Sequence, residues 1–327
     1  MKCFSSSSSL PRHFKTQPLQ VELKRSCNVE SRHCVHAVVC DTRGRILMCA
    51  GNADHLTFIR SALKPFQALP FISSGTLDQL SCSMSNIAIA CSSHSGTALH
   101  TREVFQILWN AELDVELLQC PTPVGARSQL EHNCSGKHAA FLATCRHMSW
   151  PLDSYLAGDH PLQLHVRGQV GTLLGVSPDE LVVARDNCGA PTLLLRLSQM
   201  ASLYACFKGS GQQTSLKQIS QAMLAYPELV AGSGCFDTEL MNQCSNQVLS
   251  KGGAEGIQCL SHISKGLGIA IKVEDGSRRA KHAAAIHLLS QLGWVETTKL
   301  SQLGKRFLAI APEVQLEVSG SLCPRES

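Results

Sequence analysis

A serine and a lysine stand three residues apart in the stretch Arg60-Ser61-Ala62-Leu63-Lys64-Pro65-Phe66. Positions i and i+3 of a helix lie on the same side, so the two side chains would face one way. Pro65 is tolerated only in a first turn, so this helix must begin close to Ser61. A lysine can activate a serine nucleophile when its pKa falls from about 10.4 toward neutrality. The alternative is non-catalytic: Ser61 caps a helix and Lys64 is an exposed surface charge.

Two later features strengthen the catalytic interpretation. Ser93 lies in the small polar loop 91–96, and Lys272 lies on a predicted strand at 266–273. Serine β-lactamases and penicillin-binding proteins have this order of S-x-x-K, serine loop and strand lysine. Two lysines near one serine depress each other's pKa. We therefore predict that Ser61, Lys64, Ser93 and Lys272 form one catalytic site.

A second group of candidate residues comprises Cys134, Lys137, His138 and Cys188. Cys134 shares a helical face with either Lys137 or His138, and Cys188 in the turn 186–191 could complete a small zinc site. Two buried free cysteines are the alternative. The chain has no G-x-S-x-G, no H-E-x-x-H, no Walker loop and no G-x-G-x-x-G that opens a helix.

The composition is that of a globular protein. The 327 residues are 44% hydrophobic and 17% charged, and a net charge of +4 is too small to predict a nucleic-acid or membrane partner. No apolar run reaches the roughly eighteen residues that a transmembrane helix needs. The 16 cysteines include no C-x-x-C pair and follow no secretory segment. We expect reduced thiols and a cytoplasmic location.

Residues 1–20 are serine-rich and basic, with no acidic residue before Glu22. We interpret them as a disordered tail; a targeting segment, and hence an organelle, is the alternative. The remaining residues 21–327 are expected to form the catalytic domain.

Periodicity and turn signals predict strands at both ends of the chain with helices between them. The predicted strands are 35–41, 46–50, 266–273 and an edge strand at 312–318, with a short buried strand at 87–90. The predicted helices include 66–72, 192–204, 216–225, 238–249 and 279–292. This order favours an α+β architecture over alternating βαβ units.

Six blocks in consistent order between residues 21 and 292 carry a family resemblance. They are Arg60-Ser61-x-x-Lys64-Pro65-Phe66-Gln67-Ala68-Leu69-Pro70, Cys91-Ser92-Ser93-His94-Ser95-Gly96, Asn133-Cys134-Ser135-Gly136-Lys137-His138, Asp186-Asn187-Cys188-Gly189-Ala190-Pro191, Pro227-Glu228-Leu229-Val230-Ala231-Gly232 and Gly266-Leu267-Gly268-Ile269-Ala270-Ile271-Lys272. Together they resemble the asparaginase II family, the Rhizobium etli type of L-asparaginase.

The resemblance implies hydrolysis of L-asparagine to L-aspartate and ammonia. It also implies a homodimer with a fold similar to serine β-lactamases and glutaminases, in which helices flank an antiparallel sheet and form a separate helical region. By motif, Ser61 pairs with Lys64, and Ser93 pairs with Lys272.

The resemblance further implies that Cys134, Lys137 and Cys188 bind zinc, with water as the fourth ligand. Asp186 would support that site, and Arg60 and His138 would lie beside it as substrate-binding residues. Cys259 is expected to lie near the pocket as well. A lysine binds zinc only when neutral, so we expect a strongly depressed pKa for Lys137.

The sequence departs from the family at two places on the expected pocket rim. The segment 101–131 looks shorter than in the family, and Thr97 replaces the acid that commonly follows S-H-S-G. The preference for asparagine over glutamine is therefore open. Two alternatives remain: a hydrolase of glutamine, other amides or β-lactams, and a zinc- or amino-acid-binding protein with weakened catalysis.

Overall fold

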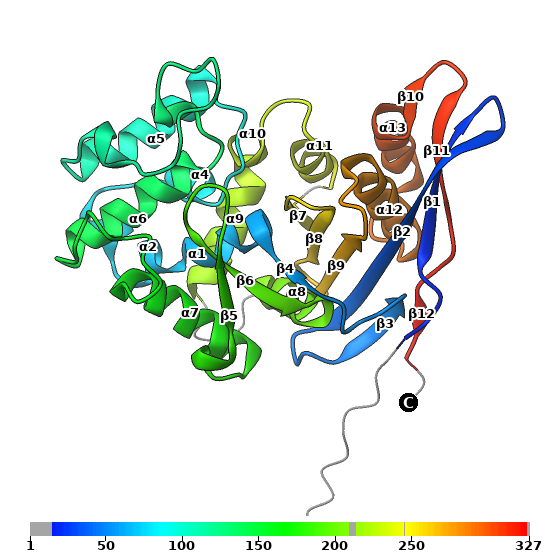
Figure 1. The fold of residues 1–327 in the computed structure, drawn as a ribbon, viewed down its shortest axis with the longest axis horizontal. Coiled ribbons are helices and arrows are strands. Elements are labelled where there is room, and N and C mark those ends of the chain that lie inside the picture. Colours follow the sequence, from blue (N-terminus) through cyan, green and yellow to red (C-terminus); the bar gives the residue numbers. More distant parts are fainter. Residues whose placement is uncertain (1–14, 209–213, 245, 326–327) are drawn as a thin grey trace, which may run out of the picture.

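The computed structural model describes residues 15–208, 214–244 and 246–325. Its centre is an antiparallel sheet in the order β10-β11-β1-β2-β9-β8-β7, which β3 extends by pairing with β2 and with β12 (Figure 1). The strands are β1 Leu19–Arg25, β2 Asn28–Asp41, β3 Ile46–Ala50, β7 Val248–Gly252, β8 Ile257–His262, β9 Leu267–Val273, β10 Ala309–Ala311, β11 Val314–Ser319 and β12 Cys323–Pro324.

Helices cover both faces of this sheet. Successive residues of a strand point to opposite faces, so β2 contributes Val39 to one core and Val38 to the other. The Val39 core is closed by α12, Arg278–Gln291, with α11, Phe236–Gln243, and α13, Thr297–Phe307, beside it. The Val38 core is closed by α8, Leu197–Ala205, and continues into the helical region.

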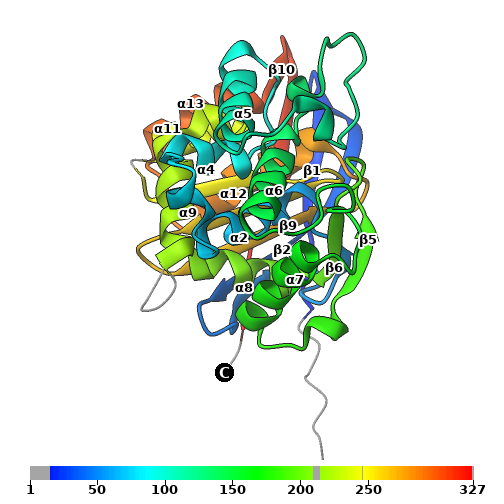
Figure 2. The same ribbon diagram turned by 90° about the vertical axis from the view of Figure 1, so that its left-hand side faces the viewer.

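The helical region packs in front of the sheet in the view of Figure 2. Its helices are α1 Lys64–Gln67, α2 Leu69–Ser73, α3 Thr76–Gln79, α4 Met84–Ala90, α5 Ala98–Asn110, α6 Ser135–His147, α7 Pro161–Leu174, α9 Thr214–Ala225 and α10 Pro227–Val230. A small antiparallel sheet in the order β4-β6-β5 borders it. These strands are β4 Leu56–Phe58, β5 Val182–Arg185 and β6 Pro191–Arg196.

The α+β class is confirmed, as are the β2–β3 hairpin and the strand β9 that carries Lys272. Three element assignments are wrong. Residues 87–90 end a helix, because Ser83 and Asn86 form a capping box at its start. Residues 192–204 divide into β6 and α8, since Arg196 has an extended backbone and Gln199 caps the new helix.

The third correction concerns 238–249, where α11 ends at Gln243 and β7 begins at Val248. The last long strand, β11, also differs from expectation, because it pairs with both β1 and β10 and is not at an edge. The position of β11 inside the sheet was missed because its partner β1 is distant in sequence and leaves no local signal.

The described part of the domain begins before residue 21. Lys15 forms a bridge with Asn52, and β1 begins at Leu19. The tail predicted for residues 1–20 therefore falls mostly on residues 1–14, which lie outside the described residues. Within the described part of the chain, no helix is both long and apolar enough to cross a membrane.

Candidate active site

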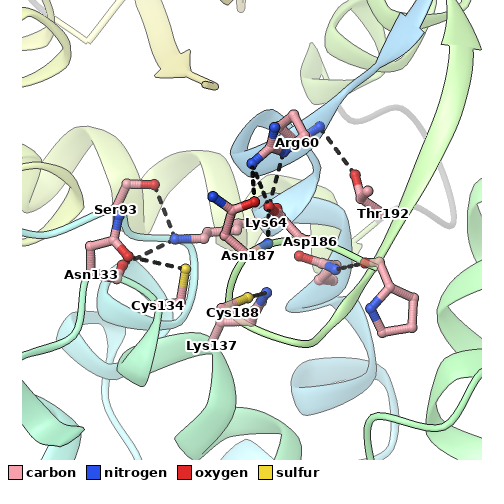
Figure 3. A network of polar contacts seen from close by, with 12 residues as sticks. Arg60, Lys64, Ser93, Asn133, Cys134, Lys137, Asp186, Asn187, Cys188 and Thr192 are labelled. Atoms are coloured by element: carbon pink, nitrogen blue, oxygen red, sulfur yellow. Dashed lines mark hydrogen bonds and ion pairs between the residues drawn. The ribbon is translucent and has the colours of Figure 1, made fainter. Parts of the chain in front are cut away.

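The S-x-x-K stretch begins on a strained residue. Arg60 has a φ of 53°, in the left-handed region that side chains rarely adopt, and it opens a 3-10 turn, Arg60–Leu63, that runs into α1. Its backbone N–H donates to Thr192 Oγ1 at 3.1 Å, and its guanidinium donates to Asp186 at 2.9 Å and to Asn187 at 3.0 Å (Figure 3). Such strain costs on the order of 1–3 kcal/mol, so these contacts must hold it in place. They fix the position of Ser61.

Lys64 is fully buried and reaches Ser93 rather than Ser61. Its Nζ donates to Ser93 Oγ at 3.0 Å, to the Ser92 carbonyl at 2.6 Å and to the Asn133 carbonyl at 3.0 Å. An ammonium group has three hydrogens, so each finds an acceptor here. The expected Ser61–Lys64 pair is thus replaced by a Ser93–Lys64 pair, although Ser61 lies on the same cavity as Ser93.

A second lysine on Ser93 is Lys251, which our sequence reasoning missed. From the end of β7 its Nζ lies 2.8 Å from Ser93 Oγ and donates to the Gly252 carbonyl at 3.0 Å. Burial lowers the pKa of Lys251 to about 7; Asp237 opposes this shift, and Lys64 adds to it. The only local signal is a lysine immediately before the Gly252-Gly253 turn, where a strand ends.

Lys272 does not form the expected pair with Ser93. Its Nζ donates to the Glu255 carbonyl at 2.6 Å and to the Val273 carbonyl at 2.8 Å. The reason is its strand: β9 lies inside the sheet between β2 and β8, whereas β7 is the terminal strand beside the Ser93 loop. Lys272 therefore fixes the β7–β8 turn that carries Glu255.

Ser61 and Ser93 open into one cavity of about 310 Å³. Its charged lining includes both signs, with Asp237 and Glu255 as acids and Arg278 and Lys281 as bases. The remaining lining residues are Asn133, Ala231, Cys235, Phe236, Gly252, Gly253, Ala254, Gly256, Gln258, Gly276 and His282. A small zwitterionic molecule matches this volume and charge pattern.

The three predicted zinc ligands lie together beside this cavity. Cys134 and Lys137 come from the start of α6, and Cys188 comes from the β5–β6 turn. Lys137 Nζ lies 3.1 Å from Cys188 Sγ, and the two thiols are hydrogen-bonded to each other. Cys134 Sγ also lies 3.3 Å from Asn133 Oδ1, which links the group to the cavity wall. Two thiols and an amine within contact are a donor set that fits zinc.

The charge state of this group differs from our expectation. The hydrogen bond from Cys188 holds the pKa of Cys134 well below its usual value, against the effect of burial. Burial alone would lower the pKa of Lys137, but the charge of Cys134 and the hydrogen bond to Cys188 raise it above its usual value. The expected depression of that pKa is therefore absent, because a thiolate lies next to the amine. A metal must displace the lysine proton to bind.

The predicted substrate-binding residues lie outside the cavity lining. Arg60 and Asp186 form an ion pair at 2.8 Å. His138 is fully buried, and its Nδ1 lies 2.7 Å from the Tyr155 hydroxyl, while its Nε2 has no partner among the described residues. Cys259 is buried opposite Lys251 in the β7–β8 pair. Contact of these residues with substrate stays a prediction.

Another group with metal-ligand chemistry comprises Cys34, His36 and Glu274, whose ligand atoms all lie within 4.8 Å of one another. The Asn52 N–H donates to His36 Nδ1 at 3.2 Å, so the proton of the neutral ring is on Nε2. That nitrogen lies 2.8 Å from Glu274 Oε1 and donates to it. A metal bound at Nε2 would need the lone pair of that nitrogen, which carries a proton here. The group is therefore a histidine–carboxylate pair.

A serine held by two buried lysines beside a small charged cavity fits an amidohydrolase. The chain belongs to the L-asparaginase II family, whose sequence pattern it matches over residues 21–324. No curated protein matches the chain.

Several solved structures are similar over most of the chain. A β-lactamase, Mb2281c from Mycobacterium bovis, is 12% identical with a TM-score of 0.43, over 84% of this chain and 95% of that one. A Bacillus glutaminase is 11% identical with a TM-score of 0.40, over 80% and 91%. Mglu is 13% identical with a TM-score of 0.41, and the match covers 80% of this chain but 67% of that one. The family assignment rests on the match over residues 21–324.

Proposed function

We propose that this protein is an L-asparaginase that hydrolyses L-asparagine to L-aspartate and ammonia through a serine nucleophile. The observation that carries the proposal is Ser93 Oγ in contact with two buried lysines, Lys64 and Lys251, on a cavity that also holds Ser61. The two signs of charge on the cavity wall suit the α-amino and α-carboxylate groups of an amino acid. Family membership supports the same reaction.

The contacts suggest a separate role for each group. Lys64 directs its three hydrogens to acceptors, so it holds the Ser93 hydroxyl in position. Lys251, with a pKa of about 7, is the group that can accept a proton near neutral pH. Ser93 lies between them and relays the proton: when Lys251 is neutral, the Ser93 hydroxyl donates to Lys251 Nζ, accepts from Lys64 and keeps one lone pair for the proton of Ser61. Ser61 is then the nucleophile.

The reaction then has two steps. Ser61 Oγ attacks the side-chain amide carbon, its proton passes through Ser93 to Lys251, and the carbon–nitrogen bond breaks as ammonia takes a proton and leaves. Water then attacks the resulting ester, gives its proton to the same relay, and releases aspartate and free Ser61. Lys251 is the base in both steps and the proton donor in the return steps.

We also propose that Cys134, Lys137 and Cys188 hold zinc beside the substrate. A bound zinc ion would polarise or position polar groups of the substrate. Asn133 connects these ligands to the cavity, because its Oδ1 lies 3.3 Å from Cys134 Sγ and its carbonyl accepts from Lys64.

Ammonia release by the purified protein tests the proposed reaction, with L-asparagine and L-glutamine assayed side by side and with or without a chelator. We expect aspartate and ammonia in equal amounts from asparagine. Faster turnover of glutamine would make the protein a glutaminase. Thermal stabilisation by asparagine without ammonia release would make it a binding protein.

The roles of the two serines are tested by Ser61→Ala and Ser93→Ala. We expect Ser61→Ala to abolish acyl-enzyme formation, which mass spectrometry of the quenched protein detects as an added mass on Ser61 in the wild type. Ser93→Ala should slow formation of the same adduct without moving it. Full activity of Ser61→Ala, or an adduct on Ser93, would reject the assignment.

A further inference from the structure

Asp237 is a buried carboxylate that the proposed mechanism does not use. It lies in the first turn of α11, is 9% exposed and lines the cavity that holds Ser61 and Ser93. Burying an ionised carboxylate is expensive unless hydrogen bonds and opposite charges compensate it. Its surroundings therefore indicate what it stabilises.

Its hydrogen bonds clamp both neighbours of Lys251. Asp237 Oδ1 accepts from the Ser250 hydroxyl at 2.7 Å, and Oδ2 accepts from the Gly252 backbone N–H at 2.8 Å. Lys251 itself donates to the Gly252 carbonyl, at the other end of the same residue. The carboxylate thus holds β7 on either side of the lysine that contacts Ser93.

The neighbouring amide of Gln258 is arranged around the charge of Asp237. Gln258 Nε2 donates to Asp237 Oδ1 at 2.7 Å and to Ser250 Oγ at 2.9 Å. An ionised carboxylate only accepts, so this orientation of the amide is obligatory. It leaves Gln258 Oε1 buried and without a hydrogen-bond partner in the described part of the chain. A lost hydrogen bond is therefore tolerated to keep a donor on Asp237.

Lys281, from α12, provides the opposite charge. It is 7% exposed, and its Nζ donates to the Gly253 carbonyl at 2.8 Å and to the Ile257 carbonyl at 3.0 Å, the two ends of the β7–β8 turn. A Cβ built on Gly252 would lie 2.9 Å from Lys281 Nζ and 3.4 Å from Asp237 Oδ2, so both charges border that one residue.

We propose that Asp237 and Lys281 are paired positioning residues that hold Lys251 against Ser93 and balance the charge it gains on accepting a proton. The inference rests on the proposed role of Lys251 as a base. Asp237 stabilises the ammonium form of Lys251, and Lys281 destabilises it. Together they keep Lys251 able both to accept and to return a proton near neutrality.

The charges around Lys251 come from four elements, and their effects on its protonated form match the opposing roles of Asp237 and Lys281. Asp237 of α11 favours its protonated form, as does Cys134 at the start of α6, whereas Lys281 of α12 and Lys64 of α1 oppose it. Burial alone would raise the pKa of Asp237, but Lys251, the Ser250 hydrogen bond and Lys281 hold that pKa below its usual value. Asp237 is therefore ionised whenever Lys251 titrates.

The test measures the titration of Lys251 directly, without substrate. The full-length protein is labelled with 13C at lysine Cε, and the Lys251 signal is assigned by its loss in Lys251→Arg. In Asp237→Asn we expect the Lys251 pKa to fall by about one unit, and in Lys281→Met to rise by about one unit. Lys281→Arg keeps the charge and should leave it within a few tenths of the wild type.

Opposite shifts support the proposal, because general damage to the site would not change sign between the two variants. Shifts in the same direction, or no shift in either, overturn it. If Asp237→Asn does not unfold cooperatively, the comparison of Lys281→Met with Lys281→Arg decides alone. The acid limb of kcat/KM with asparagine should follow the same signs. Absence of amidohydrolase activity in the wild type rejects the proposed function and leaves the titration result standing.

Discussion

At the scale of single residues, the hydroxyl of Ser93 is controlled by two lysines that come from opposite directions. Lys64 approaches from the helical region and Lys251 from the end of the sheet, and both are almost without exposure. Among the described residues, a third lysine, Lys272, is hydrogen-bonded only to main-chain carbonyls of the β7–β8 turn and of its own strand. These different partners predict different consequences of removing each charge.

Replacing Lys251 by Met should lower kcat for asparagine by roughly 10²-fold or more, since general-base catalysis contributes at least that factor. Lys272→Met is the matched control, as it removes a lysine from the same sheet without a contact to Ser93. We expect it to reduce thermal stability while kcat stays within a few fold. Steady-state ammonia release checks both. A larger loss in Lys272→Met than in Lys251→Met would restore the Ser93–Lys272 pair.

The pH dependence follows from the same lysine. Lys251 has a pKa of about 7 and must be neutral to accept a proton. The active fraction is therefore small below pH 7 and grows as pH rises through that value, so kcat/KM should show an acid limb near pH 7. A profile that stays flat from pH 5.5 to 8.5 in matched ionic strength would exclude Lys251 as the base.

At the scale of secondary structure, the close approach of α6 to α4 places the zinc ligands. A Cβ on Gly136 would lie 2.2 Å from the Ile89 carbonyl oxygen, which is backbone and cannot move aside. Gly136 stands between Cys134 and Lys137, so any displacement of α6 moves two of the three ligands.

Gly136→Ala should therefore lower the free energy of unfolding by about 2 kcal/mol or more, since it overpacks a filled interface. Zinc affinity should fall with it. Gly168→Ala in the middle of α7 is the control, because no atom lies within 4 Å of its added Cβ. That variant should gain about 0.5–1 kcal/mol. Urea unfolding measures the change in stability, and competition with a zinc indicator measures zinc affinity. Equal changes in Gly136→Ala and Gly168→Ala would contradict the role of the α4–α6 contact.

At the scale of the whole molecule, the proposed zinc site joins two parts that are distant in sequence. Cys134 and Lys137 belong to the helical region, while Cys188 belongs to the turn of the small β4-β6-β5 sheet. Arg60 adds a second link to that turn through Asp186 and Asn187, as Figure 3 shows. Metal binding should thus stabilise the fold as well as the site.

We expect zinc at a hundred times its Kd to stabilise the folded protein by about 2.7 kcal/mol, seen as a rise in Tm that a chelator reverses. Cys188→Ala should lose this response. Cys145→Ala, which removes a buried thiol from the same helix α6 two turns beyond Lys137, should keep it. A zinc-dependent rise in Tm that survives Cys188→Ala would place the metal elsewhere.

The sequence alone determined the features that depend on local spacing. Pro65 and Ser61 placed the start of a helix, the turn after Asp41 predicted the β2–β3 hairpin, and six ordered motifs indicated the family. Cys134, Lys137 and Cys188 were likewise expected to lie together, as they do, whereas their binding of zinc stays a prediction. These predictions succeed because the residues that decide them are neighbours in the chain, or because the motifs recur as units.

The tertiary structure alone decided which lysine contacts which serine. Lys64 contacts Ser93 across the start of α6, and Lys251 replaces Lys272 because β7, not β9, borders the Ser93 loop. Strand order and the approach of one element to another depend on contacts between residues far apart in sequence, which leave no periodic trace. The raised pKa of Lys137 has the same origin in part, since Cys188, 51 residues away, adds to the effect of the neighbouring Cys134 against burial. Proximity in space determines proton affinity, and one strand's place in a sheet determines that proximity.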